Sequence, residues 1–425
     1  CPSDCAPPGT SGLLPNPIVN NINNIIQISG NNFVNGAEVL VDGVAYPPFW
    51  TGYVSDILMN IFVPSGTPAN NYQITVRNPS SLVSSPPLIL TVNSPAGACS
   101  VGSWQTTTPL SFTAGPPGSG GTGAHDSAST AYNNYIYLTG GEYGVATSPA
   151  ILSFRNRIKR AIINPDGSLG PWFDLMPISG VCPPGQSCTL PVGLQDHKAV
   201  IYQHSAGTTP HLYIIGGVVG TGAIDDVRYA PVNPDGSLGV WTQGPDLDQR
   251  RHGHDIAIVN NKLYAYGGTF ASTPLNSVEY VNINSDGSLT GDATNTWITT
   301  QQLPQEMQYV GGGPYPNSNG KIYASGGEMP ACPPVQNEIF YTTPQSSGAI
   351  INWLSTLSLP ETLLDHAVNF ISSSIIVTGG ANRIMNAGCS AELLFEVKDK
   401  TYIAQVDSSG AITSWTNGPD LPAPR

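Results

Sequence analysis

The sequence predicts an all-β protein in which a small immunoglobulin-like β-sandwich precedes a β-propeller of four-stranded blades. Three observations support this prediction. Glycine (47) and proline (39) together make 86 of the 425 residues, a content that excludes a protein built of long helices. Residues 13–93 alternate apolar and polar side chains between turn signals, as the strands of a sandwich do. After residue 105, one pattern of paired glycines and late tryptophans recurs five times.

Size and charge limit the function classes. A chain of 425 residues is long enough for a small domain and a large repeat fold, and 40% hydrophobic residues support folded cores. Charged residues are only 10% and the net charge is −13, which leaves no basic stripe for nucleic acid. No apolar run approaches the roughly 20 residues that span a bilayer. The opening residues 1–10 lack signal-peptide features, so we expect a mature or excised segment.

The expected strands of the N-terminal module lie at 25–33, 37–46, 57–64, 71–79 and 87–92. The motifs PNPIVNNI, ISGNNFVNGAEVLVDG and VPSGTPANNYQITVRNPSS follow one another through it. This order resembles the TIG (IPT) domain, an immunoglobulin-like fold, whose most recognisable stretch is matched by Gly30, Asn32, Phe33, Gly36, Val39, Val41 and Gly43. The resemblance implies a spacer or binding module of an extracellular protein. Some TIG domains read DNA, but the acidic balance disfavours that reading.

The repeat that follows has a mechanical explanation. Its short apolar strands end at Gly141, Gly217, Gly268, Gly327 and Gly380, and its second halves end at Trp172, Trp241, Trp297, Trp353 and Trp415. The tryptophans are 69, 56, 56 and 62 residues apart, which suits one four-stranded blade per period. D-G and S-G turns make tight hairpins, paired glycines fit the crowded inner ends of strands, and Tyr and Trp fill the space between blades. We therefore expect stability to come from the stacking of neighbouring blades.

Residues 245–255 (PDLDQRRHGHD), the glycine pair after them and the late aromatic residue resemble the kelch family of β-propellers. The resemblance covers about three quarters of the chain. Residues 421–425 (LPAPR) repeat the approach to a blade, whereas 103–110 (SWQTTTPL) look like the last strand of a blade whose earlier strands are missing. Together they suggest a ring of more than five blades, which Trp104 closes by pairing with strands from beyond Arg425. A five-bladed ring with a frayed end is the alternative.

These patterns give a domain plan. We expect an N-terminal tail at 1–12, the sandwich at 13–93, a linker and candidate closing strand at 94–108, and the propeller at 109–425.

The candidate site is the face of the propeller that carries the long loops, because variable loops on a rigid scaffold usually carry binding. These loops are 142–152, 173–196, 218–227, 269–278, 328–338 and 381–393, whereas the opposite face has the short D-G and S-G hairpins. Glu142 and Glu328 follow their glycine pairs directly, near the mouth of the channel, and Arg383 lies in the last loop. We take these three as candidate binding residues. The alternative for the glutamates is that they are solvated carboxylates at a channel rim.

Two further groups of polar residues have structural interpretations. Histidines recur at the start of blades, and we interpret them as structural hydrogen-bonding groups: His125, His197, His254 and His366. Arg155, Arg157, Lys159 and Arg160 alternate along one strand, and we interpret them as a solvated outer edge that discourages sheet pairing.

The seven cysteines fit disulfides in an exported protein better than a zinc site, because no CxxC pair occurs. Cys182 and Cys188 flank a short loop and should form a local bridge. Cys332 and Cys389 fall in corresponding loops of successive blades and should pair. Cys5 should pair with Cys99, which leaves Cys1 as a lipid-bearing or intermolecular cysteine.

No catalytic motif can be identified. The sequence lacks a P-loop, HExxH or a legible Ser-His-Asp arrangement. Galactose oxidase combines a kelch scaffold with copper, but the Tyr, His and Cys ligand pattern of that enzyme is not apparent here. Asp166 stands directly before Gly167, which departs from the Asp boxes of sialidases. We therefore expect a non-catalytic extracellular or cell-surface protein, without cofactor or metal, whose loop face binds a glycan or protein. A secreted carbohydrate-active or galactose-oxidase-like enzyme is the alternative.

Overall fold

The computed structural model describes most of the chain. The described residues are 7–19, 24–46, 51–63, 67, 70–79, 83–93, 102–110, 126–141, 155–164, 166–176, 181–205, 207–314, 320–330, 332–371, 374–386, 391–407 and 409–425. The chain divides into a first unit, made of residues 1–100 with the short segments 316–319 and 370–375, and a second unit made of the rest of residues 101–425. Every regular element assigned in the described residues is a strand, which confirms the predicted all-β class.

The N-terminal unit is a sandwich of two sheets. One sheet has the order β1 (Gly9–Leu14), β3 (Asn24–Asn31), β7 (Leu58–Val63), β6 (Thr51–Ser55). The other has the order β2 (Ile18–Val19), β9 (Leu88–Asn93), β8 (Asn70–Arg77), β4 (Glu38–Val41), β5 (Val44–Ala45). Alternate side chains such as Ile26 and Ile28 in β3, and Ile74 and Val76 in β8, are fully buried in one shared core. The alternation of apolar and polar residues along each strand thus determines which face of the sheet is buried.

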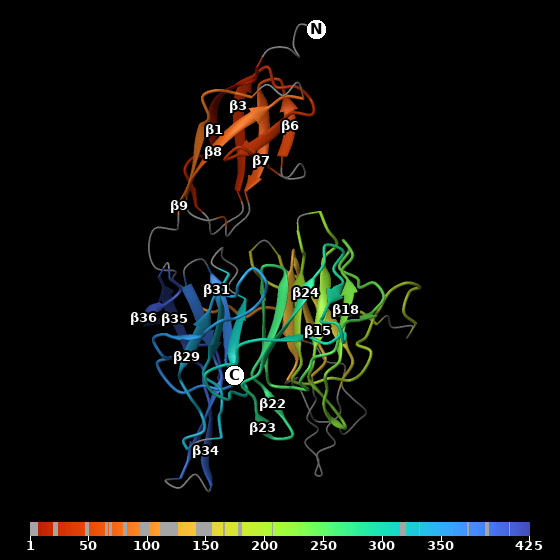
Figure 1. Ribbon diagram of the computed structural model, residues 1–425, viewed down its shortest axis with the longest axis vertical. Coiled ribbons are helices and arrows are strands. Elements are labelled where there is room, and N and C mark those ends of the chain that lie inside the picture. Colours follow the sequence, from red (N-terminus) through yellow and green to blue (C-terminus); the bar gives the residue numbers. More distant parts are fainter. Residues whose placement is uncertain are drawn as a thin grey trace. The chain divides into compact units, whose positions relative to one another are not determined.

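The second unit consists of successive antiparallel sheets, each of which is one blade, with four strands in each blade except blade three, which has five (Figure 1). Five blades are present in the described residues. Blade one is β10 (Ala128–Tyr132), β11 (Tyr135–Thr139), β12 (Ile158–Ile162) and β13 (Phe173–Asp174); blade two is β14 (Lys198–Tyr202), β15 (His211–Ile215), β18 (Val227–Pro231) and β19 (Thr242–Gln243). Blade three is β20 (Asp255–Val259), β21 (Lys262–Tyr266) and β24 (Val278–Ile283), which pairs with both β25 (Leu289–Thr290) and β26 (Ile298–Thr299). Blade four is β27 (Gly311–Pro314), β28 (Ile322–Ser325), β29 (Ile339–Thr342) and β30 (Leu354–Ser355); blade five is β31 (Ala367–Ile371), β32 (Ser374–Thr378), β35 (Thr401–Val406) and β36 (Ile412–Asn417).

Tyrosine hydroxyl groups join neighbouring blades. A tyrosine in the second strand of each of the first four blades donates to the carbonyl of the hairpin glycine in the next blade. The pairs are Tyr137 to Gly236 (2.9 Å), Tyr213 to Gly287 (2.8 Å), Tyr264 to Gly348 (3.0 Å) and Tyr323 to Gly410 (2.7 Å). Glycine is required at such a site: Gly287 has φ +84°, and a Cβ there would lie 2.0 Å from His211 Nδ1. The repeated D-G and S-G turns therefore serve the contact between blades as well as the hairpin.

Tryptophan indoles form a second repeating link. Those of blades two to four donate to a backbone carbonyl in the segment that follows the preceding blade: Trp241 to Thr189 (2.8 Å), Trp297 to Pro245 (3.0 Å) and Trp353 to Gln301 (3.2 Å). The indole nitrogen of Trp415 in blade five has no hydrogen-bond partner among the described residues. Pro245 and Gln301 lie four residues after the tryptophan of the preceding blade. Trp172 donates to Thr108 (3.3 Å), four residues after Trp104, and Trp104 donates to Pro419 (2.9 Å), four residues after Trp415. Trp104 thus has the contact of an outer-strand tryptophan.

The interpretation of the basic cluster as a sheet edge is wrong. Lys159 and Arg160 lie in β12, which is paired on one side with β11 and on the other with β13, and Arg155 and Arg157 precede this strand. Lys159 is buried and lies 3.1 Å from Asp174, and Arg160 donates to the Asp235 carbonyl of the next blade at 2.6 Å. Alternating charges along a strand occur both at a sheet edge and in an inner strand whose charges are paired. The strand that covers β12 here is β13, whose residues lie more than ten positions further along the chain.

Candidate functional site

The loop face is built by one repeated bridge. In blades two to five, the residue that follows the glycine pair bridges the segment just before the inner strand of its own blade. These bridges are Val218 to Gln195, Thr269 to His252, Glu328 to Gln308 and Ala381 to Leu364. The loops after the glycine pairs therefore emerge at the same end of the propeller, where β22 (Thr269–Phe270), β23 (Thr273–Pro274) and β34 (Glu392–Val397) lie in Figure 1. The predicted loop 142–152, with Glu142, lies outside the described residues.

An arc of backbone hydrogen bonds surrounds the channel mouth. One residue per blade takes part, and each has a left-handed backbone with φ between 50° and 56°: Asp126, Asp196, Gly253, Tyr309 and Asp365. The amide of each of the last four donates to the carbonyl of the one before it, at 3.0, 3.3, 2.7 and 3.1 Å. Because the arc repeats from blade to blade, it brings three aspartates from distant parts of the sequence to one place.

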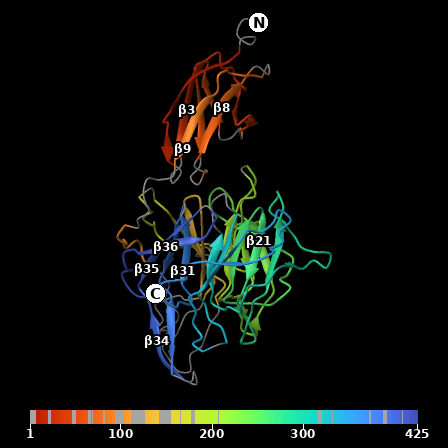
Figure 2. The same ribbon diagram turned by 60° about the vertical axis from the view of Figure 1, so that its left-hand side comes forward.

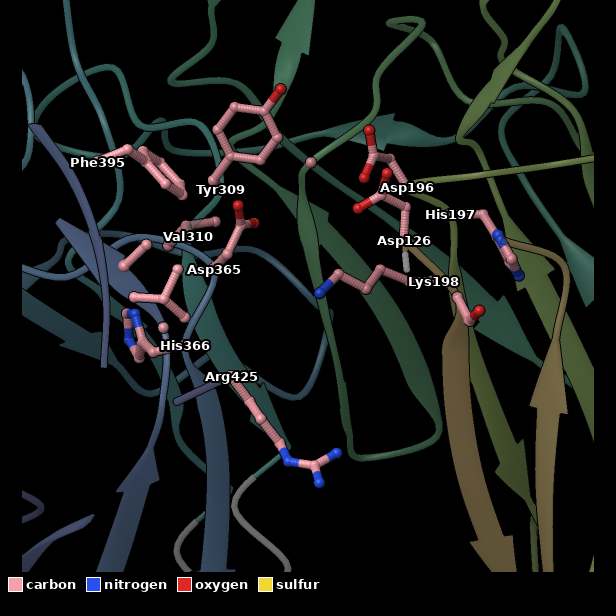
Figure 3. Close-up of a pocket in the computed structure, with 15 residues that line it drawn as sticks. Asp126, Asp196, His197, Lys198, Tyr309, Val310, Asp365, His366, Phe395 and Arg425 are labelled. Carbon is pink, nitrogen blue, oxygen red and sulfur yellow. The ribbon is translucent and has the colours of Figure 1, made fainter. Parts of the chain in front are cut away.

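These aspartates border a cavity of about 500 Å³. Figure 3 shows Asp126 and Asp196 on one side, Asp365 and Tyr309 on the other, and Lys198 extending between them. The amine of Lys198 lies 3.6 Å from a carboxylate oxygen of Asp255. These aspartates are not among the binding residues predicted from the sequence. Their signal was present as the Asp-His pairs at 196–197 and 365–366, of which only the histidines were considered.

Two carboxyl groups in and beside the mouth have raised pKa values. Asp365 keeps contact with solvent, yet burial and the nearby charge of Asp196 raise its pKa to about 7, against the opposing effect of Lys198. Burial also raises the pKa of Asp255. Asp196 is additionally 3.3 Å from His252. Lys198 and Arg425 also line the cavity, so the mouth carries groups of both signs, and its net charge becomes more negative as the pH rises through the pKa of Asp365.

The blade-start histidines hold neighbouring blades together. Nε2 of His197 lies 2.8 Å from the Thr139 hydroxyl of blade one, and Nε2 of His366 lies 2.8 Å from the Ser325 hydroxyl of blade four. Burial lowers the pKa of His197 to about 4 and that of His366 to about 3, so both are neutral at physiological pH. Neither nitrogen of His254 has a partner among the described residues, and His125 lies outside them. The structural interpretation thus holds for His197 and His366.

Glu328 and Arg383 are brought together, although 55 positions separate them in sequence. Their side chains are 3.3 Å apart, and Glu328 also accepts a hydrogen bond from Gln308 at 3.0 Å. Glu328 is only 7% exposed, so the interpretation as a solvated rim carboxylate is wrong for this residue. Arg383 has a second ion pair with Glu392, at 3.2 Å. These ion pairs join the base of the last loop to the loop of blade four and to the strand opposite.

The last loop is a β-ribbon, formed by β33 (Ala381–Met385) and β34. The equivalent loops of blades two and three contain only two-residue strands: β16 (Val218–Val219) with β17 (Gly222–Ala223), and β22 with β23. Every residue of β34 is exposed, including Leu393 (66%), Leu394 (51%) and Phe395 (45%). The ribbon projects beyond the blades in both views (Figures 1 and 2). Phe395 and Val397 at its base line the cavity at the mouth.

One disulfide closes a short loop next to the hairpin of blade two, where the Ser187 amide donates to the Leu238 carbonyl at 3.0 Å. Cys182 and Cys188 are bonded, with Cα atoms 5.8 Å apart, which is the local bridge that the sequence predicts. Cys332 is disulfide-bonded, and its predicted partner Cys389 lies outside the described residues, as do Cys1, Cys5 and Cys99. Within the described part of the chain, no three His, Cys, Asp or Glu side chains form a group that could hold a metal ion. In that part there is also no helix long and apolar enough to cross a bilayer.

Comparison with known proteins identifies one blade. Residues 250–300 match the family described as Kelch motif, and they span β20 to β26. Blade three is therefore similar to a kelch repeat. Its glycine pair and tryptophan recur at the corresponding places of the other four blades.

Two further similarities accompany the kelch match. The human Kelch repeat and BTB domain-containing protein 13 is 34% identical over 95 residues, which are 22% of this chain and 18% of that protein. The chain therefore matches under a fifth of the length of this relative. A solved structure titled "Structure of YjhT" is 11% identical, with a TM-score of 0.46, over 71% of this chain and 85% of that one.

Proposed function

We propose that the protein is a non-catalytic binding protein whose propeller presents its loop face to a macromolecular partner at the cell surface. The Kelch motif indicates a protein-binding scaffold. The observation that carries the proposal is the exposed apolar β33–β34 ribbon. Soluble proteins rarely leave several large apolar side chains together in water unless a partner covers them, and an unpaired strand edge is a template for further pairing.

The two faces of the propeller differ in a way that favours binding. On the opposite face, the hairpins are short and nearly identical, and each glycine carbonyl is used by a tyrosine of the preceding blade in four of the five blades. On the loop face, the segments differ in length from blade to blade, and those of blades four and five are joined by the Glu328–Arg383 ion pair. A ring that served only as a spacer would not require this asymmetry.

The arrangement of titratable groups fits binding better than catalysis. His197 and His366 are held by hydroxyl groups of neighbouring blades and are neutral, and Glu328 is occupied by Arg383 and Gln308. The mouth beside the apolar ribbon remains accessible, with three aspartates, Lys198 and Arg425 in its lining. A protein surface with basic and apolar groups would complement both features. A cell-surface glycan is the second class of partner that we include in the test.

We further propose that the chain acts outside the cell. Disulfides persist in oxidising compartments, and both the Cys182–Cys188 bond and the bonded state of Cys332 are compatible with export. The TIG-like sandwich would then act as a spacer, and the pairing of Cys5 with Cys99 and a lipid or intermolecular bond at Cys1 belong to the same proposal. Intact-mass measurement and nonreducing peptide mapping of the exported protein test these assignments.

The experiment that tests the binding face uses a ribbon variant and a matched control. Leu393→Ser combined with Phe395→Ser removes apolar surface from the ribbon. The control, Ile351→Ser, removes an equally exposed apolar side chain (62%) beside the 345–349 turn of the other face. Binding of the labelled protein is measured on the cells that produce it, and on protein and glycan fractions of their surface.

We expect the ribbon variant to bind about tenfold more weakly or worse, with an unchanged thermal midpoint because the replaced side chains are exposed. The control should bind like the native protein. Equal binding by all three proteins would contradict the proposal. Turnover of a sugar by the purified chain with stoichiometric copper would favour the carbohydrate-active enzyme instead.

A further inference from the structure

An asparagine–glycine pair lies at an exposed turn between the two sheets of the sandwich. The turn comprises residues 34–37, between β3 and β4, and the Ala37 amide donates to the Val34 carbonyl at 2.8 Å. Gly36 has φ +92°, the left-handed conformation that the third residue of a type II turn requires. Asn35 and Gly36 are both exposed. The side-chain amide of Asn35 is therefore in water, next to the backbone amide of a glycine.

Neither of these two amide groups is occupied by another contact. Among the described residues, the Asn35 side chain and the Gly36 backbone amide form no hydrogen bond. The turn is held at its base, where the buried side chain of Asn78 accepts from the Val34 amide at 3.3 Å and donates to the Asn32 carbonyl at 2.8 Å. The tip can therefore change its backbone torsions by breaking one hydrogen bond of the turn, without unfolding of the sandwich.

A second asparagine–glycine pair provides an internal comparison. Asn417 is also exposed, but it is the last residue of β36, where it pairs with Tyr402 of β35. The Gly418 amide donates to the Thr401 carbonyl at 2.8 Å. Rotation of the backbone at this pair would break that hydrogen bond and disturb the pairing of the two strands. The third such pair, at 319–320, begins outside the described residues.

We propose that Asn35 is a site of spontaneous covalent modification, at which the amide converts to aspartate and isoaspartate. The Gly36 nitrogen loses its proton to base in the solvent and attacks Cγ of Asn35. This closes a five-membered succinimide ring and breaks the bond from Cγ to the side-chain nitrogen, which takes up a proton and leaves as ammonia. Glycine favours the attack because it has no side chain to obstruct the approach.

Water completes the reaction by opening the ring at one of two carbonyl carbons. Attack at Cγ restores the normal backbone with an aspartate at position 35. Attack at the backbone carbonyl carbon leaves the chain running through the side chain, as isoaspartate. Water is the only co-reactant, and either product carries one more negative charge than asparagine.

The two products should affect the sandwich differently. Aspartate keeps the normal backbone, so the hydrogen bond from Ala37 to Val34 can persist. Isoaspartate lengthens the main chain by one carbon within the turn, so this hydrogen-bonded ring cannot keep its geometry. Phe33, just before the turn, is only 2% exposed in the core of the sandwich. We therefore expect faster hydrogen exchange in β4 of the isoaspartate form than in β4 of the aspartate form.

The test follows both asparagines in one protein. The folded 425-residue chain is incubated at pH 8 and at pH 5, and peptide mapping separates asparagine, aspartate and isoaspartate at positions 35 and 417. At pH 8 we expect Asn35 to convert about tenfold faster than Asn417 or more, because Gly418 must first lose its hydrogen bond to Thr401. Conversion should be slower at pH 5, since less base is available to remove the amide proton.

Two controls separate the effect of the fold from that of the dipeptide. In urea, where both pairs lack structure, Asn35 and Asn417 should convert at similar rates. Asn35→Ser has no side-chain amide, so hydrogen exchange in β4 should stay constant during its incubation. Conversion of Asn417 as fast as that of Asn35 in the folded protein, or an Asn35 that does not react, would overturn the proposal. Aspartate without isoaspartate would overturn the succinimide route. None of these results bears on binding through the β33–β34 ribbon.

Discussion

The buried ion pair between Arg251 and Glu279 should contribute strongly to the stability of blade three. Both side chains are buried, with exposed fractions of 0% and 1%, and their closest atoms are 2.5 Å apart. Arg251 also donates to the Gly267 carbonyl at 2.6 Å and to the Ser277 hydroxyl at 2.8 Å. Glu279 accepts from the Asp248 amide at 2.6 Å. The pair therefore joins the approach segment of blade three to its second and third strands.

Arg251→Met should destabilise the propeller strongly, because it leaves the carboxylate of Glu279 buried without its cation. Removal of one partner of a buried pair costs about 3–5 kcal/mol, and for a domain of this size that corresponds to a decrease of roughly 10 °C in the thermal midpoint. Arg250→Met is the matched control. Arg250 is the neighbouring residue, pairs with Asp225 at 3.1 Å and is 56% exposed, so its loss should cost less than about 1 kcal/mol.

The stability cost of Arg251→Met should depend on pH. Burial raises the pKa of Glu279, and Arg251 opposes that rise. Without Arg251 the folded-state pKa increases further above the unfolded value, so the folded variant retains a proton and loses stability as the pH rises through the folded pKa. Urea unfolding at pH 5 and pH 8 should therefore show a larger cost at pH 8. An Arg251→Met variant no less stable than Arg250→Met at pH 8, or a cost independent of pH, would refute this account. In Arg251→Met/Glu279→Leu, most of the stability should return.

Three more predictions concern the contacts between blades and the loop face. His197→Gln should make the stability of the protein less sensitive to acid. The pKa of His197 is about 4 in the folded state and about 6.5 in the unfolded state, so this residue makes the native protein about 2 kcal/mol less stable at pH 5 than at pH 7.5. Urea unfolding of the variant at the two pH values should show a smaller difference. Tyr323→Phe leaves the Gly410 carbonyl without its 2.7 Å hydrogen bond and should cost about 1–2 kcal/mol in urea unfolding; an unchanged midpoint would contradict this role. Nonreducing peptide mapping should find Cys182 linked to Cys188, and the double serine variant should lose about 2 kcal/mol, whereas two freely alkylatable thiols would contradict the bridge.

Sequence reasoning located the blades because their signals are periodic. The glycine pairs, hairpins and tryptophans recur at blade spacing, and the structure gives them repeated partners, such as Tyr137 with Gly236 and Trp297 with Pro245. The Cys182–Cys188 bond was predictable because both cysteines flank one short loop. The kelch match at 250–300 falls on the blade whose pattern is fullest.

The same reasoning missed pairings between distant segments. Lys159 was assigned to a solvated edge, although Asp174 neutralises it inside the blade. The pairing of Glu328 with Arg383 joins loops of two different blades, and no local pattern reports it. The acidic mouth was missed because each aspartate looks ordinary by itself, and only the arc of hydrogen bonds brings Asp126, Asp196 and Asp365 together.

By itself, the sequence determined which segments become strands, where each hairpin turns and which residue types recur between blades. These properties depend on backbone freedom at glycine and on the alternation of apolar side chains, and both act over a few residues. The tertiary structure alone decided which charges are buried in pairs, which aspartates share the mouth and which apolar strand remains in water. Those outcomes depend on the distance between side chains that are tens to hundreds of residues apart, and on the desolvation that follows when blades stack.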